Sequence, residues 1–245
     1  MSDPDLNLAQ IATENPAAAV DHLIRTTHAA GTAHALLASE STETNAARGF
    51  DRTLEGVVDF EAGRALLAYV SEGSAERTLV IGGQLFRSHG RERWVLVSDR
   101  EGGRDNLTLD GFGLLSLARG ADETLHVEKR ADGAIVLEVI ARDSVLFDDL
   151  SATDILQVPT ALLVEPLRAK IATDAFGRIT DYCVESTRSR PRLSVQRRRV
   201  RLSLSEFGMP VDIRAPDPGS VRRPRRRRSL FHRARRRLGY PALDG

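Results

Sequence analysis

Histidine is the side chain best suited to metal binding and to proton transfer near neutral pH, and the sequence contains six. His22 and His28 stand six residues apart in a segment that we expect to be helical. At about 100° per residue their directions differ by about 120°, so the two side chains do not easily share a metal ion. We expect His22 and His126 at the surface and His89 at a hairpin tip. The histidines therefore predict no metal site.

Other groups that could do chemistry are equally sparse. Cys183 is the single cysteine, so one chain cannot form a disulfide or a cysteine-based zinc site. Within a strand-like run it is typical of a small buried apolar residue. The sequence contains no G-x-G-x-x-G, G-x-x-x-x-G-K-[ST] or G-x-S-x-G motif. We predict a protein that is not an enzyme and uses no cofactor, and we expect any binding site to be apolar and concave.

The most uneven distribution in the sequence is that of arginine, which is concentrated near the C-terminus. Residues 221–240 hold ten arginines and no acidic residue, which leaves 25 basic and 34 acidic residues elsewhere, a net charge of −9. Three interpretations of this arginine-rich segment stay open: a solvated extension, a contact with an anionic membrane, or sequence-blind binding of nucleic acid. The arginines that would bind an anionic surface are Arg222, Arg223, Arg225, Arg226, Arg227, Arg228, Arg233, Arg235, Arg236 and Arg237.

The elements that must position any site begin with a helix. Asn15 can cap it, Pro16 suits its first turn and Gly31 suits its end. Strand patterns then follow at 32–42, 50–60, 64–72, 76–88 and 91–99. Because the turns between most of them are short, an antiparallel meander is favoured over parallel βαβ units.

The second half of the sequence adds short helices and further hairpins. A leucine-rich stretch at 105–122 predicts a short helix, and another is expected within 151–164. Hairpins are predicted around 131–133 and around 174–177, followed by a half-exposed strand in which Val200, Leu202 and Leu204 alternate with polar residues. We predict one α+β domain at 14–216, between a disordered leader at 1–13 and a disordered polybasic tail at 217–245.

Taken in order, several stretches resemble the LppX/LprG-type lipoproteins, whose fold is like that of the lipoprotein carrier LolA. The resemblance spans roughly residues 15–216. It rests on "THAAGTAHALLASES", "LEGVVDFEAGRALLAYV", "LVIGGQLFRSHGRERWVLV", "LTLDGFGLLSLARGADE", "ATDAFGRITDYCVE" and "RRVRLSLSEFGMPVDIRAP".

This resemblance implies a LolA-like half-barrel: a curved antiparallel sheet with an N-terminal helix and one or two inserted helices on its concave side. It also implies a non-enzymatic protein, which we expect to be a monomer, that holds a lipid acyl chain in an apolar cavity. The alternatives are a sensor or protein-interaction module of the RseB type without a transported lipid, and nucleic-acid association through the arginines. The residues expected to line the cavity are Val57, Leu66, Leu79, Ile81, Trp94, Leu96, Leu137 and Leu202.

Two features depart from the resembled family. Its members begin with a signal peptide and a lipidated cysteine, whereas the first twenty residues here show neither. Its members also do not end in an arginine run. Read as it stands, with no apolar run of about 18 residues, the chain is expected in the cytoplasm or peripheral to a membrane. If a signal peptide is missing from this chain, it is expected outside the cytoplasm.

Overall fold

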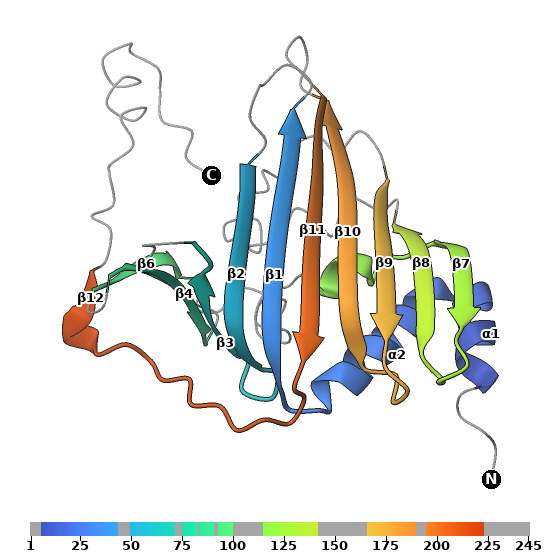
Figure 1. Cartoon of the computed structure of the whole chain (residues 1–245), viewed down its shortest axis with the longest axis horizontal. Helices are drawn as coiled ribbons and strands as arrows, with labels where there is room; N and C mark the ends of the chain where they lie inside the picture. The colour runs from blue at the N-terminus through green and yellow to red at the C-terminus, as the bar shows by residue number, and fades with distance from the viewer. Residues whose placement is uncertain are drawn as a thin grey trace, which may run out of the picture.

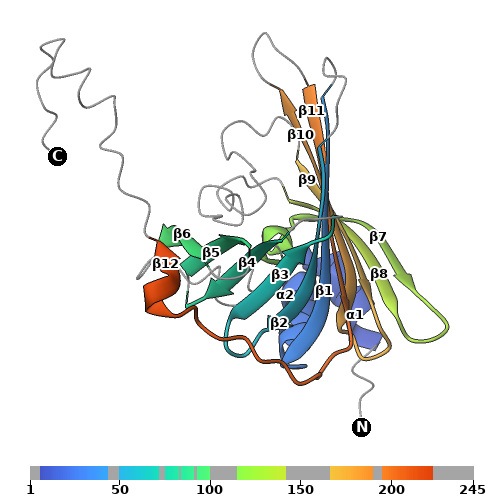
Figure 2. The same cartoon turned by 60° about the vertical axis from the view of Figure 1, so that its left-hand side comes forward.

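Twelve strands form one open, curved sheet with the two α-helices on its inner side (Figures 1 and 2). The computed structural model describes residues 6–43, 50–71, 75–82, 84–90, 93–99, 115–141, 166–189 and 195–222, to which all structural statements refer. The helical elements are α1 (Leu6–Glu14), α2 (Pro16–His28), η1 (Leu115–Ala118) and η2 (Pro218–Ser220). The strands are β1 (Thr32–Glu43), β2 (Phe50–Asp59), β3 (Arg64–Tyr69), β4 (Glu76–Ile81), β5 (Gln84–His89), β6 (Trp94–Asp99), β7 (Glu123–Lys129), β8 (Ile135–Ala141), β9 (Leu167–Thr173), β10 (Ile179–Ser189), β11 (Val195–Ser205) and β12 (Val221–Arg222).

The strand order is β12-β6-β5-β4-β3-β2-β1-β11-β10-β9-β8-β7. Neighbouring strands are antiparallel, except that β12 pairs in parallel with β6. The first and last long strands, β1 and β11, meet at the centre of the sheet. Two antiparallel wings therefore extend from the centre, β2 to β6 on one side and β10 to β7 on the other.

Helix α2 has the ends that the sequence predicts. The side chain of Asn15 accepts a hydrogen bond from the backbone N–H of Ala18 at 3.0 Å, and Pro16 occupies the first turn. Gly31 follows the helix with φ +78°, a left-handed conformation that favours glycine. One stripe of the helix is buried against the sheet, and its members are Ala19, Val20, Leu23, Ile24 and Thr27.

The chain ahead of α2 differs from the disordered leader expected for residues 1–13, because Leu6–Glu14 forms helix α1. Leu8 and Ala12 lie one turn apart and are buried. The backbone carbonyl of Ala12 accepts a hydrogen bond from the hydroxyl of Thr124 on β7. The helix is thus stabilised by packing on a strand more than a hundred residues away, which local sequence signals do not reveal.

The predicted meander is present with one additional turn. The strand expected at 76–88 is the β4–β5 hairpin, which turns at Gly82 with φ +57°. The leucine-rich stretch contributes the single 3-10 turn η1, while residues 105–114 and the helix expected within 151–164 lie outside the described residues. Residues 217–222, expected in the disordered tail, form η2 and β12.

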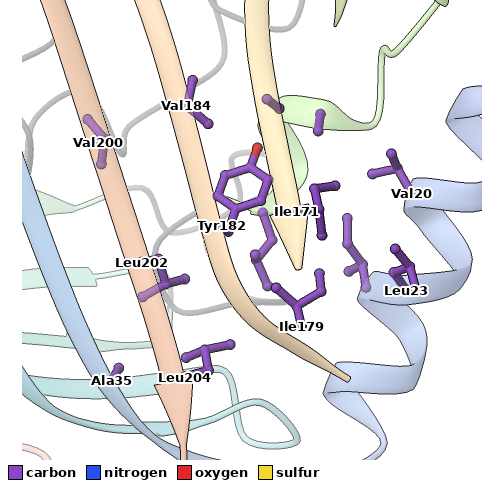
Figure 3. Packing of buried hydrophobic residues seen from close by; sticks show 14 of the residues in the cluster. Val20, Leu23, Ala35, Ile171, Ile179, Tyr182, Val184, Val200, Leu202 and Leu204 are labelled. Atoms are coloured by element: carbon purple, nitrogen blue, oxygen red, sulfur yellow. The ribbon is translucent and has the colours of Figure 1, made fainter. Parts of the chain in front are cut away.

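The largest core lies between the sheet and α2. Figure 3 shows Ile171 of β9 and Ile179 and Tyr182 of β10 between the sheet and Val20 and Leu23 of α2. Tyr182 is fully buried there. Because β11 pairs with β1 and β10 pairs with β11, this core ties the helical layer to the centre of the sheet.

Candidate functional site

The inner face of the sheet, the face that carries the helices, is apolar across both wings. A single cluster of buried side chains joins α1 and α2 to β1–β5 and to β8–β11. The buried polar side chains of the described chain all carry hydroxyls: Thr27, Ser39, Thr78, Ser88 and Thr173. Arg87 lies on the same face of β5 as Leu85 and is half-buried, so this face is mainly apolar but carries a charge. A mainly apolar interior suits an aliphatic ligand better than a charged one.

On the β2–β6 wing, four leucine and valine side chains form what we call the inner wall: Leu54, Leu67, Val80 and Leu85. Each is at most 2% exposed. Val80 pairs with Leu85 across β4 and β5, and its neighbour Leu79 points to the opposite face, as strand alternation requires. The inner wall is therefore a continuous row of buried apolar side chains from four consecutive strands.

Gly56 lets β2 and β3 approach closely beside the inner wall. It lies opposite Leu67 in the strand register. A Cβ at this position would lie 2.0 Å from the carbonyl oxygen of Leu66 and 2.9 Å from the Cα of Leu67. Both are backbone atoms that cannot swing aside, so only glycine fits.

The strongest helical contacts fall on the other wing. Helix α1 packs on β7, α2 packs on β10 and η1, and η1 packs on β8 (Figure 2). The inner wall of β2–β5 belongs to the same apolar cluster but stands on the wing away from these contacts. The concave side thus has a helical part and a strand-lined part.

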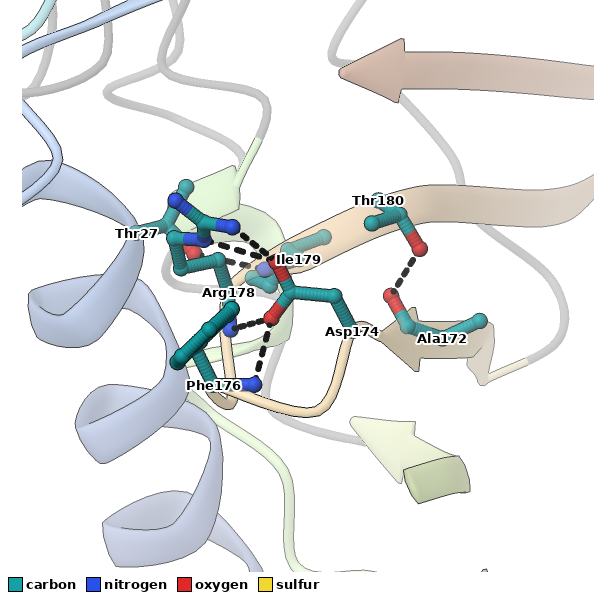
Figure 4. A network of polar contacts seen from close by, with 7 residues as sticks. All are labelled: Thr27, Ala172, Asp174, Phe176, Arg178, Ile179 and Thr180. Carbon is teal, nitrogen blue, oxygen red and sulfur yellow. Dashed lines mark hydrogen bonds and ion pairs between the residues drawn. The ribbon is translucent and has the colours of Figure 1, made fainter. Parts of the chain in front are cut away.

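The hairpin at 174–178 fixes α2 to the sheet (Figure 4). One carboxylate oxygen of Asp174 accepts hydrogen bonds from the backbone N–H groups of Phe176 at 2.9 Å and Arg178 at 3.0 Å. The other oxygen accepts from the guanidinium of Arg178 at 2.7 Å. The next backbone N–H, that of Ile179, donates to the hydroxyl of Thr27 at 2.8 Å. The stretch "DAFGR" at 174–178, part of the quoted "ATDAFGRITDYCVE", therefore has a structural role at this end of the sheet.

His28 closes the same end of α2. Its ring stacks on Phe60 with 5.1 Å between centroids. Burial, and secondarily the positive charge of Arg119, lowers the pKa of His28 from 6.5 to about 4. The imidazole is therefore neutral near pH 7, in keeping with a packing role.

The outer face of the β2–β6 wing carries a second, smaller apolar cluster. Its buried members are Leu79, Phe86, Leu96 and Ile213, with Val57, Leu66, Ile81, Trp94, Val211 and Val221 packed around them. Six of the eight residues expected to line a cavity are in this outer cluster: Val57, Leu66, Leu79, Ile81, Trp94 and Leu96. The remaining two, Leu137 and Leu202, are in the inner cluster. The eight residues do not line one common surface.

The chain after β11 covers this outer cluster, and we call residues 208–222 the closing segment. It begins where the N–H of Gly208 donates to the carbonyl of Thr32 at 2.9 Å. The carbonyl of Ile213 then accepts from the guanidinium of Arg64 at 3.2 Å. It ends as β12, where Val221 and Arg222 pair with Trp94 and Val95 (Figure 1).

The outer face of the central strands is polar instead. Arg201 forms a two-pronged pair with Asp181, both contacts at 2.7 Å, and Arg199 pairs with Glu185. These pairs border an open depression of about 420 Å³, which also contains the single cysteine, Cys183. Burial raises the pKa of the Cys183 thiol. Exposed pairs of this kind contribute little to stability.

Of the ten arginines expected to bind an anionic surface, Arg222 is described and is exposed on β12. The other nine lie outside the described residues. Within the described ranges, no set of three or more His, Cys, Asp and Glu side chains is grouped closely enough to bind a metal ion. In the same ranges, every helix is too short or too polar to cross a bilayer.

No family model and no curated protein matches the sequence. Among solved structures, an uncharacterized conserved protein from Thermus thermophilus is similar at 8% identity, with 83% of this chain and 98% of that chain covered and a TM-score of 0.41. A LolA superfamily protein from Nitrosomonas europaea is similar at 8% identity, with 79% and 94% covered and a TM-score of 0.35. The lipoprotein LppX from Mycobacterium tuberculosis is similar at 14% identity, with 82% and 100% covered and a TM-score of 0.37. All three structures are less than 15% identical to this chain and have TM-scores below 0.5.

Proposed function

We propose that the protein is a non-enzymatic lipid-binding protein whose curved sheet acts as a half-barrel. The acyl chain lies on the concave side, between the inner wall of β2–β5 and the helical layer on β7–β10. In this arrangement the site is formed by Leu54, Leu67, Val80 and Leu85 rather than by the outer-face residues Leu79 and Leu96.

One observation supports the proposal: a single cluster of buried apolar side chains spans the concave side of both wings, while the strongest helical contacts fall on only one of them. An apolar chain placed against the inner wall gives up no hydrogen bonds there. Because the inner-wall side chains are at most 2% exposed, the gain comes from the ligand's own apolar surface, at about 25 cal/mol for each Å² removed from water. The sheet does not close into a barrel, because its edge strands β12 and β7 do not pair with each other.

The proposal is tested by adding bulk to the inner wall. Val80→Phe enlarges a side chain on the inner wall, whereas Ile81→Phe enlarges its strand neighbour on the outer face. Lipids extracted from each purified protein are identified by mass spectrometry. Displacement of a fluorescent fatty acid gives the affinity.

We expect bound acyl lipid in the wild type and in Ile81→Phe, and at least tenfold weaker binding in Val80→Phe with its circular dichroism retained. Overpacking costs about 1–3 kcal/mol of stability in a core, so both variants are compared at a temperature where both are folded. Equal loss in the two variants would place the site elsewhere. A wild type free of lipid that also fails to bind the fluorescent fatty acid would exclude the proposal and favour a protein-interaction module.

A further inference from the structure

The arginine-rich segment begins at a defined edge of the folded sheet. Strand β12 carries Arg222 and pairs with β6, which places the start of this segment at the end of the β2–β6 wing. Five more arginines follow within the next six residues: Arg223, Arg225, Arg226, Arg227 and Arg228. Six residues of chain span at most about 21 Å, so this charge is tied to the β6 edge by covalent length alone.

The folded part of this edge also carries arginines, although β6 ends in Asp99. The guanidinium of Arg77 lies over the ring of Trp94, 5.1 Å from its centroid. Arg93 directly precedes Trp94 in the chain, Arg222 pairs with Val95 through β12, and both are exposed. The two acidic side chains of the closing segment have local partners. Asp212 pairs with Arg214, and Asp217 accepts a hydrogen bond from the N–H of Gly219.

The rest of the protein has the opposite charge. Outside residues 221–240 the chain carries a net charge of −9. An anionic surface therefore repels the body and attracts one edge, and this asymmetry orients the molecule as well as binding it. Leu230, Phe231, Leu238 and Tyr240 are interspersed among the arginines. Apolar and aromatic residues among cationic ones suit the interface of a bilayer, where both kinds of side chain find partners.

We propose that the β12–β6 edge, together with the arginines that follow it, is a docking surface for an anionic lipid bilayer. The protein binds the bilayer with this edge toward the headgroups and with β7, the opposite edge of the sheet, away from them. The closing segment is what fixes this orientation, because it carries the chain from β11 across the outer face to the β6 edge. Docking is independent of whether an acyl chain occupies the concave side.

The single tryptophan makes the orientation measurable. Trp94 lies on β6 and pairs directly with Val221 of β12. Leu125 lies on β7 and is 42% exposed, so a tryptophan there is accommodated at the surface. Ten strand spacings of about 4.8 Å separate β6 from β7, which is about 48 Å measured along the sheet. The double variant Trp94→Phe/Leu125→Trp moves the fluorophore to the far edge and leaves the arginines unchanged.

The experiment uses the full chain and vesicles of phosphatidylglycerol and phosphatidylcholine that carry a dansyl-labelled headgroup. Vesicles of phosphatidylcholine alone serve as the uncharged control. We expect binding to the anionic vesicles only, weakened at least tenfold between about 0.1 M and 1 M salt, where the screening length falls from about 10 to 3 Å. Energy transfer to the dansyl group should be at least threefold greater from Trp94 than from the tryptophan at position 125.

A charge variant completes the test. Arg223→Gln/Arg225→Gln/Arg226→Gln/Arg227→Gln/Arg228→Gln keeps the chain length, and its unfolding temperature should match that of the wild type. We expect it to lose most vesicle binding. Binding that survives this change, equal energy transfer from the two edges, or binding of duplex DNA without binding of anionic vesicles would each overturn the proposal.

Discussion

The hydroxyl of Thr27 links α2 to the sheet, and removing it tests how the helical layer is held. The residue is fully buried, donates to the carbonyl of Leu23 at 2.8 Å and accepts from the backbone N–H of Ile179 at 2.8 Å. Thr27→Val keeps the shape of the side chain and deprives the buried N–H of its acceptor. A buried donor without a partner costs about 1–3 kcal/mol, and the added methyl returns up to about 0.8 kcal/mol.

With the full return from the methyl group, the expected net loss is about 0.2–2.2 kcal/mol, or up to about 40-fold in the ratio of folded to unfolded protein. Amide hydrogen exchange at Ile179 gives the local readout, and denaturant unfolding gives the global one. Thr27→Ser is the matched control, because it keeps the hydroxyl and loses only a methyl group. We expect the Ile179 amide to lose protection in Thr27→Val and to keep it in Thr27→Ser. Equal protection in both variants would refute the assigned role of this hydrogen bond.

Three further changes follow from the same geometry. His28→Phe should remove part of the pH dependence of stability. The His28 side chain takes up a proton near pH 6.5 in the unfolded chain and only near pH 4 in the folded chain, so wild-type stability falls as the pH is lowered from about 6.5 to about 4, by at most about 1.4 kcal/mol per pH unit. The same dependence of melting temperature on pH in both proteins would contradict this. Gly56→Ala should destabilise by about 1–3 kcal/mol in thermal unfolding, because the new Cβ meets backbone atoms of β3; an unchanged melting temperature would show that β2 and β3 can separate. Ile213→Ala should cost about 2–5 kcal/mol and shift the fluorescence of Trp94 to the red, since both residues belong to the outer cluster; a blue or unshifted emission would mean that the closing segment does not cover Trp94.

The two apolar faces of the β2–β6 wing have different roles: one is the proposed acyl-chain site, and the other holds the closing segment. The inner wall faces the concavity, where we place the acyl chain, whereas the outer cluster is occupied by the protein's own closing segment. A charged substitution at Leu79 or Leu96 is therefore expected to detach the closing segment rather than to block lipid. Substitution on the inner wall is the more direct probe of ligand binding.

Several parts of the fold follow from local sequence signals alone. Asn15, Pro16 and Gly31 determine the ends of α2, because capping and left-handed turns depend on residues that are adjacent in the chain. Asp174 marks the β9–β10 hairpin for the same reason. Period-two alternation identifies β11, whose outer side chains are polar.

Local signals do not decide which side of a strand is inner when both sides are apolar. In β4 the neighbours Leu79 and Val80 are both buried, one under the closing segment and the other on the inner wall. Their sequence context is equivalent, so their roles depend on what the rest of the chain places over each face. The sequence by itself determined the helix α2, the hairpins and the charge of the arginine-rich segment. Only the tertiary structure decided the position of α1, the inner wall and the edge at which the arginines begin, because each depends on contacts between residues far apart in the chain.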